Sequence, residues 1–232
     1  QKLRNIAKEY NFSYLATKSR RISTALNIAI RGHKNAKWIY KVDDDIFLTG
    51  NFLKKLKNTY KNVERNEIWS PGMVIPVQNI NSYTYYLFLN TLGLKEKFTK
   101  IFGRIRVGTN SSIIKSNGKA AIWIWKNSLP LNIVSETFYR KNRNMVDVCP
   151  FRCSINAALI KRDLWSRMGG FNASFPGQLE ADEISLTRQI LIFDVLQIVV
   201  SLETFVGHFS YASQENVVKK FFDKNKHLFK EN

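Results

Sequence analysis

The chain has 232 residues, of which 44% are hydrophobic, so it can bury the core of one sizeable α/β domain, or of two small ones at most. Lysine and arginine together number 36 against 18 acidic residues, and this net charge of +18 attracts polyanions without selecting nucleic acid, anionic lipid or phosphorylated small molecules. The most apolar stretch, 190–202, is interrupted by Asp194 and Gln197, so no membrane-spanning helix is expected.

The first third of the chain alternates between helix and strand signals. Ser23 is a candidate N-cap for a helix that Gly32 ends, and Thr49 or Asn51 is a candidate cap for the helix after the aspartates. Two prolines in the last strand of this part indicate an irregular or edge element. In chain order, the predicted elements are a helix at 1–10, a strand at 12–16, a helix at 23–32, a strand at 38–42, a helix over 52–60 and a strand at 68–77.

The middle of the chain, 80–145, is aromatic, basic and punctuated by glycine, and we expect it to carry substrate-specific loops. Trp123 and Trp125 lie at alternate positions of a predicted extended run, so they share one face, which favours a core role over stacking on a sugar ring. The predicted elements from here on are a helix at 83–92, the extended run at 119–127, a strand at 153–161, a helix at 163–168 ended by Gly169 and Gly170, a helix at 182–193, a strand at 195–200 and an amphipathic helix at 217–229.

Strands separated by helices favour a mostly parallel sheet that is covered on both faces. In such sheets the ligand crevice lies beyond the carboxyl ends of the strands. Asp43, Asp44 and Asp45 follow the strand at 38–42 directly. They therefore stand where a ligand is expected.

Three adjacent carboxylates repel one another unless a cation or a basic partner balances them. In an extended segment Asp43 and Asp45 point the same way, so the pair could hold one Mg²⁺ or Mn²⁺ ion while Asp44 faces away. The alternative is an acidic turn that caps the next helix or pairs with Lys41. The aspartates alone do not decide between these two interpretations.

Four segments of the chain resemble four segments of one known protein family, in the same order. The segment "STALNIAIRGHKNAKWIYKVDDDIFLTGNFL" resembles the centre of the GT-A glycosyltransferases, in particular the large group called family 2, in which a helix leads into a hydrophobic strand that ends in the "DxD" metal motif. The segment "ALIKRDLWSRMGGFNASFPGQLEADEISLTRQI" is similar to the part of that family with a "GGF" turn and an acidic pair before a helix. The segments "TFVGHFS" and "KNKHLFK" resemble its late histidine strand and its C-terminal segment.

The resemblance covers most of 18–230, with 80–145 unmatched. It implies a GT-A, Rossmann-like fold with a mostly parallel sheet flanked by helices, but without the N-terminal strands with which family members usually begin, as expected of a fragment. It also implies one catalytic domain over 1–232. In this domain 1–79 forms the donor and metal half, 80–145 a variable acceptor-side region, and 146–232 the acceptor and base half with the C-terminal helix.

The resemblance also assigns the metal and the donor. It implies that Asp45, together with Asp43, binds Mn²⁺ or Mg²⁺ and meets the diphosphate and ribose of a nucleotide-diphosphate sugar. His208 would complete the metal site or contact the diphosphate, and Mn²⁺ accepts an imidazole ligand better than Mg²⁺ does. The alternative for His208 is a satisfied histidine in a strand.

Further residues are predicted to bind the donor, although their sequence patterns are less specific. Arg20 and Arg21, with Lys18, are positioned to reach its phosphates, although a solvated basic loop is equally consistent. Gly170, with Gly169, would let the backbone approach the donor sugar, and a helix-ending glycine pair explains these residues as well. Asp44 is also predicted to contact the donor.

The resemblance makes Asp182 the candidate general base, which takes the proton of an acceptor hydroxyl as that hydroxyl attacks the anomeric carbon. Such a reaction inverts the anomeric configuration. The family usually has Glu-Asp at this point, whereas here Ala181 precedes Asp182, so Glu183 is the alternate and Glu180 lies just upstream. Asp182 could instead cap the helix that follows.

These residues predict a metal-dependent, inverting glycosyltransferase that moves a sugar to a glycan or lipid-linked acceptor in polysaccharide or glycoconjugate synthesis. We expect it in the cytoplasm, with lysines of 54–61 and 219–230 able to hold it at the anionic inner face of a membrane, and without a nucleic-acid partner. Two alternatives use the same features: a metal-dependent nuclease or phosphotransferase, in which Asp43, Asp45, Asp182 and His208 hold the ions, and a non-catalytic basic module that binds nucleic acid.

Overall fold

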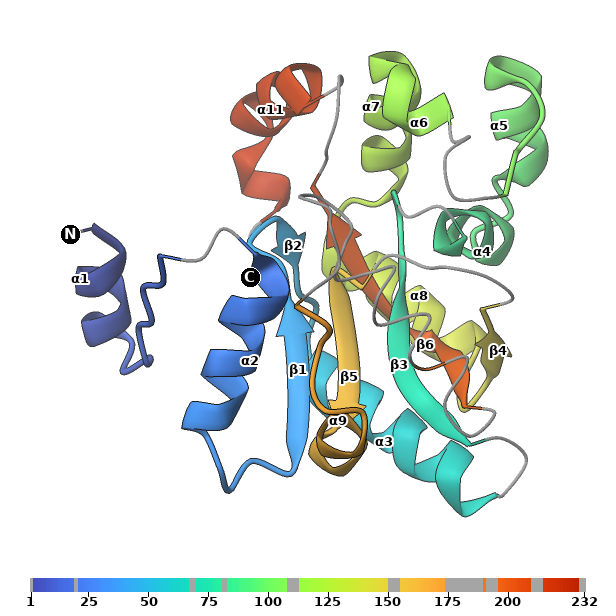
Figure 1. Cartoon of the computed structure of the whole chain (residues 1–232). Helices are drawn as coiled ribbons and strands as arrows, with labels where there is room; N and C mark the ends of the chain where they lie inside the picture. The colour runs from blue at the N-terminus through green and yellow to red at the C-terminus, as the bar shows by residue number, and fades with distance from the viewer. Residues whose placement is uncertain are drawn as a thin grey trace.

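The computed structural model describes residues 2–18, 21–66, 70–80, 83–107, 113–149, 155–173, 190, 196–209 and 215–229. Its elements form one mixed six-stranded sheet with helices around it (Figure 1). In chain order they are α1 (Lys2–Glu9), α2 (Ile22–Gly32), β1 (Trp38–Val42), β2 (Ile46–Phe47), α3 (Phe52–Arg65), β3 (Pro71–Gln78), α4 (Thr84–Thr91), α5 (Lys95–Phe102), α6 (Ile113–Ser116), α7 (Gly118–Asn127), α8 (Leu131–Lys141), β4 (Val146–Val148), β5 (Ala157–Lys161), α9 (Arg162–Arg167), β6 (Gln197–His208), α11 (Glu215–Lys224) and the 3₁₀ turn η2 (Lys226–Leu228).

The sheet has the strand order β1-β5-β3-β6-β2, and β4 also pairs with β6. Only the β3–β6 pairing among the described strands is parallel, so the predicted mostly parallel sheet is wrong in its pairing. The reason is that β5 lies between β1 and β3 and runs against both. β1, β3 and β6 still run in the same direction, so their carboxyl ends meet at one edge of the sheet.

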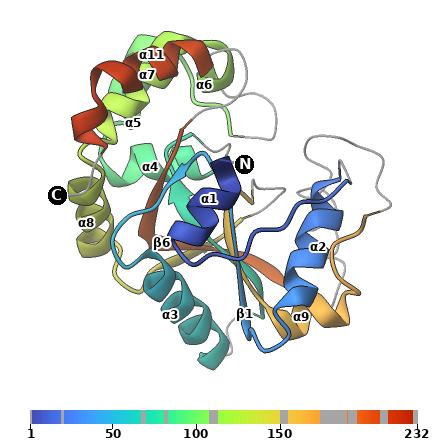
Figure 2. The ribbon, with the colours of Figure 1, turned by 90° about the vertical axis from the view of Figure 1, so that its left-hand side faces the viewer.

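Side chains alternate between the two faces of the sheet, as strand geometry requires. Val74, Leu159 and Val199 pack with the apolar stripe of α3, which contains Leu56 and Tyr60. The intervening side chains join a larger core with α2, α9 and the helices from α4 to α8; from the strands this core takes Met73, Ile75, Ala158, Ile160, Ile198 and Val200. Figure 2 shows α2 and α9 on one side of β1 and α3 on the other.

Most predicted elements are confirmed, with shifted ends, but two strands are wrong. Residues 12–16 form no strand, and 119–127 belong to α7. A short apolar run fits a buried helix as well as a strand, and here the side chain of Asn117 caps α7 by accepting from the backbone N–H groups of Lys119 and Ala120 at 2.9 and 3.2 Å. The helix at 182–193 lies outside the described residues, apart from helical Ile190.

The helical geometry of α7 separates the two tryptophans. Trp125 is fully buried, and its indole N–H donates to the carbonyl of Phe209 at 2.8 Å. Trp123 packs edge-on against Phe98 and Phe102 in another part of the core. The prediction of a shared face is therefore wrong, while the core role is confirmed for Trp125.

The prolines and the caps also differ from prediction. β3 is irregular, with a register shift beside Pro76, but it lies between β5 and β6 rather than at an edge. Pro71 is its first residue, where a missing N–H is tolerated. Ser23 lies inside α2, and Thr49 donates instead to the carbonyl of Phe205 at 2.6 Å. Asn51 stands at the N-cap of α3 without a capping hydrogen bond from its side chain.

Candidate functional site

The predicted site lies where β1 ends and the chain turns into β2. β2 pairs antiparallel with the end of β6, and Ile46 stands opposite His208. The carbonyl of Asp45 then accepts a hydrogen bond from the backbone N–H of Phe209 at 2.8 Å. This pairing brings the third aspartate of the motif alongside the histidine, although the two are distant in the chain.

Asp45 and His208 are in direct contact. Oδ2 of Asp45 lies 3.1 Å from Nε2 of His208, and the exposed fractions of the two side chains are 30% and 1%. Burial raises the pKa of the Asp45 carboxyl, but the hydrogen bond and charge of His208, a backbone N–H and the charge of Lys41 outweigh it and leave that pKa below its ordinary value. Asp45 is therefore an ionised, half-buried carboxylate at neutral pH.

Two asparagines hold the histidine, and the sequence analysis missed both. Oδ1 of Asn79 accepts from the backbone N–H of His208 at 2.8 Å, and Nδ2 of Asn79 donates to the hydroxyl of Ser128 at 3.0 Å. Nδ2 of Asn156 lies 2.9 Å from Nε2 and 3.1 Å from Nδ1 of the imidazole. Asn79 follows β3 directly, and Asn156 directly precedes β5. Their positions at the ends of strands were the sequence signal that could have identified them.

Asp43 does not share the position of Asp45. The residues after β1 form a turn, in which the N–H of Ile46 donates to the carbonyl of Asp43 at 3.4 Å, so the predicted extended geometry is wrong. The carboxylate of Asp43 is 2.5 Å from the buried ammonium of Lys41, while the carboxylate of Asp45 meets His208. Asp44 is exposed. The turn breaks the period of two that would have aligned Asp43 with Asp45.

The remaining predicted residues divide between described and undescribed parts of the chain. Arg20, Asp182, Glu183 and Glu180 lie outside the described residues. The guanidinium of Arg21 donates to the carbonyl of Ala173.

Gly170 has a structural reason of its own. Its φ is +88°, and a Cβ at this position would stand 2.9 Å from Oδ1 of Asn27. That oxygen accepts from the N–H of Phe171 at 2.9 Å and from the indole of Trp165 at 3.2 Å. The contact accounts for glycine at 170 without a ligand, and an approach to the donor sugar stays a prediction.

The contact between Asp45 and His208 fits one divalent ion. Ligand bonds of about 2.1 Å place adjacent ligands around an octahedral ion about 3 Å apart, and the 3.1 Å between the two ligating atoms meets that requirement. Within the part of the chain that the structure describes, no cluster of three or more histidine, cysteine or acidic residues could hold a metal. Among the described residues, Asp45 presents a carboxylate oxygen and His208 an imidazole nitrogen at this contact.

Comparison of the chain with known protein-family models gives no match, and neither does comparison with curated proteins. Over the described residues, no helix has both the length and the apolar character needed to cross a lipid bilayer.

Proposed function

We propose that this protein is a metal-dependent, inverting glycosyltransferase that transfers a sugar from a nucleotide-diphosphate donor to a glycan or lipid-linked acceptor. One observation carries the proposal: the contact at 3.1 Å between Asp45, at the carboxyl end of β1, and His208, at the end of β6. These are two of the three residues to which the motif resemblance assigns the metal; the third, Asp43, pairs with Lys41 instead. Their contact required the pairing of β2 with β6, which no local sequence pattern encodes.

The donor set suits the proposed cofactor. One carboxylate oxygen and one imidazole nitrogen match the preferences of Mn²⁺, and hard ligands such as diphosphate oxygens fill its remaining positions. When bound, the ion supplies Lewis-acid stabilisation of the leaving nucleotide diphosphate. Asn79 fixes the backbone of His208, and the carboxamide of Asn156 lies against the ring, so the imidazole is held for this role.

The acceptor chemistry rests on the resemblance. Asp182, or Glu183 in its place, would take the proton of the acceptor hydroxyl as its oxygen attacks the anomeric carbon on the face opposite the leaving diphosphate. A single displacement of this kind inverts the configuration and needs no covalent intermediate. Proton transfer, C–O bond formation and departure of the diphosphate balance within one step.

Several helices of the unmatched region lie near the end of the sheet that carries Asp45 and His208, which supports a role for this region in acceptor binding. Figure 1 shows α5, α6 and α7 together with α11 near the end of the sheet at which β1 and β6 finish. Helices rather than loops therefore make up much of 80–145. We propose that these helices contribute to acceptor specificity, and that the exposed lysines of α3 help to hold the enzyme at an anionic membrane.

Calorimetric binding of UDP, GDP, CMP and dTDP, with and without Mn²⁺, tests the proposal. We expect one nucleotide to bind in a Mn²⁺-dependent manner, and Asp45→Ala to abolish this binding. Asp163→Ala is the control, because Asp163 is an exposed carboxylate of α9 that pairs with Arg167. Binding that is insensitive to both metal and Asp45, or divalent-dependent cleavage of nucleic acid, would contradict the transferase.

A further inference from the structure

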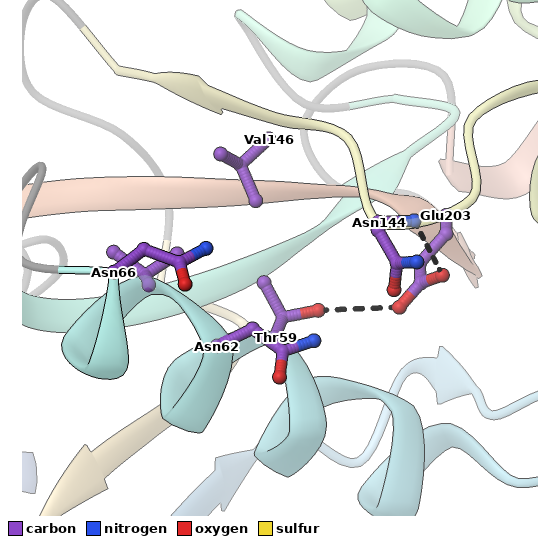
Figure 3. A pocket seen from close by; sticks show the side chains of 7 residues that line it. Thr59, Asn62, Asn66, Asn144, Val146 and Glu203 are labelled. Atoms are coloured by element: carbon purple, nitrogen blue, oxygen red, sulfur yellow. Dashed lines mark hydrogen bonds between the residues drawn. The ribbon is translucent and has the colours of Figure 1, made fainter.

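A second polar site lies away from the aspartates, between the last turns of α3 and the strands β4 and β6 (Figure 3). It is a cavity of about 150 Å³, enough for about five water molecules. From α3 it is lined by Thr59, Asn62, Val63 and Asn66, which are spaced along one face of the helix. The opposite wall consists of Asn144, Val146 and Glu203. None of these residues takes part in the Asp45–His208 site.

Glu203 is the only acidic residue among the described residues that line this cavity, and it is 5% exposed. Its Oε2 accepts from the backbone N–H of Asn144 at 3.0 Å. Its Oε1 lies 3.5 Å from the hydroxyl of Thr59, at the limit of a hydrogen bond. That hydroxyl has a single proton and two closer neighbours, the hydroxyl of Ser201 at 2.8 Å and the carbonyl of Lys55 at 3.2 Å. Among the described residues, Oε1 therefore receives at most a weak hydrogen bond.

The carboxylate also has no counter-charge within the part of the chain that the structure describes. Among the described residues, no lysine, arginine or histidine forms an ion pair with Glu203. A buried carboxylate without a cation is costly, and this chain has 36 basic side chains from which a partner could have come. The carboxyl end of α3 adds the negative end of a 14-residue helix on the same side of the cavity. Both features attract a positive charge.

The residues that line the cavity favour one kind of cation over another. Hard divalent metals take six or more oxygen ligands and usually more than one carboxylate, whereas the described lining offers a single carboxylate, beside three carboxamides, one hydroxyl and two valines. A primary ammonium has three protons to share among Oε1 and the asparagine side chains, and an alkyl stem fits against Val63 and Val146. Asn66 and Asn144 are exposed, so the cavity opens to solvent between them.

We propose that this cavity binds a primary alkylammonium group, with Glu203 as its counter-charge. The group could belong to a free small amine or to a lysine side chain of another protein, since both present the same ammonium and stem. The proposal is independent of the transferase function.

The test is a titration of the ¹⁵N-labelled protein with n-butylammonium chloride, followed by NMR. In the wild type we expect shifts of the side-chain amide signals of Asn62, Asn66 and Asn144, with a Kd in the millimolar range. Sodium chloride at equal concentration and neutral n-butanol should not reproduce them. Nα-acetyl-lysine amide is titrated in parallel, and binding of butylammonium alone would identify the free amine as the source.

Glu203→Gln keeps the shape of the side chain and removes its charge, and we expect it to weaken butylammonium binding by about tenfold or more. Glu64→Gln is the matched control, because Glu64 lies on α3, the helix that lines the cavity, but is exposed and pairs with Lys161. Three results would overturn the proposal: no shifts in the wild type, equal binding by Glu203→Gln, or shifts with calcium chloride but not with butylammonium. The wild-type titration decides the first and third even if Glu203→Gln does not fold.

Discussion

Oδ2 of Asp45 and Nε2 of His208 lie 3.1 Å apart although the two residues are separated by 163 positions in the chain. The contact depends on two backbone pairings, β1 within the sheet and β2 against the end of β6. It places a carboxylate and an imidazole at the end of the sheet where three strands that run in one direction finish.

Asp45→Ala should lower sugar transfer by more than several hundredfold, because in the proposed mechanism an ion held by Asp45 would contribute about 4 kcal/mol of leaving-group stabilisation. Steady-state kinetics with the donor identified by calorimetry measure the effect. Asp163→Ala, which removes an exposed carboxylate, should retain wild-type kcat/KM. Wild-type transfer that persists in excess chelator would contradict the metal-dependent mechanism.

Asp45 should also make the protein sensitive to acid. Its pKa is lower in the folded than in the unfolded state, so the unfolded state binds the proton first as the pH falls, and the stabilisation is present above about pH 4 and lost below it. The difference in free energy of unfolding between wild type and Asp45→Asn should therefore shrink as the pH falls below about 4. Urea unfolding at several pH values measures it, and a constant difference would contradict the assignment.

Asn79→Ala should loosen the histidine. The substitution removes the acceptor of the His208 N–H and the donor to Ser128, which leaves buried polar groups unpaired and costs about 1–3 kcal/mol of stability. Because Asn79 supports His208, which we propose to bind the metal, we expect Mn²⁺ affinity to fall about 10- to 100-fold. Chemical denaturation and Mn²⁺ titration test both parts, with exposed Asn90→Ala as the control. Loss of stability with unchanged affinity would restrict Asn79 to a structural role.

Gly207→Ala should disturb the strand just before His208. A Cβ there would stand 2.9 Å from Cη2 of Trp125 and 3.0 Å from Cδ2 of Leu131, both in the packed core. We expect a loss of about 1–3 kcal/mol in the free energy of unfolding, as for other overpacked positions. A Cβ at Gly50 would meet nothing within 4 Å, so Gly50→Ala should stay within about 0.5 kcal/mol of wild type. If the two variants had equal free energies of unfolding, the core would accommodate the added methyl group without loss of stability.

Tyr60 should limit stability at alkaline pH. Burial, with a smaller contribution from the charge of Glu64, raises the pKa of its hydroxyl, which donates to the carbonyl of Pro71 at 2.6 Å. As the pH rises above about 10, the unfolded state loses this proton before the folded state, so stability falls. Tyr60→Phe should cost about 0.5–1.5 kcal/mol at neutral pH but decline less steeply above about pH 10. Parallel alkaline profiles would contradict the raised pKa.

The amino-acid sequence by itself determined the local elements around the site. The strand at 38–42 that delivers the aspartates and the amphipathic helix after Asn51 follow from apolar periodicity over neighbouring residues, and both are confirmed. Apolar periodicity decided less for 119–127, because a short buried run satisfies a helix and a strand alike until a cap such as Asn117 is considered.

Only the tertiary structure decided which strands are neighbours and which side chains meet. The reversed direction of β5, the turn that parts Asp43 from Asp45, and the roles of Asn79 and Asn156 all arise from contacts between distant segments. The cavity around Glu203 likewise joins α3 to strands that come much later in the chain. Local periodicity states which face of an element is apolar, but strand pairing is selected by the packing of the whole core, and that selection is what brings Asp45 to His208.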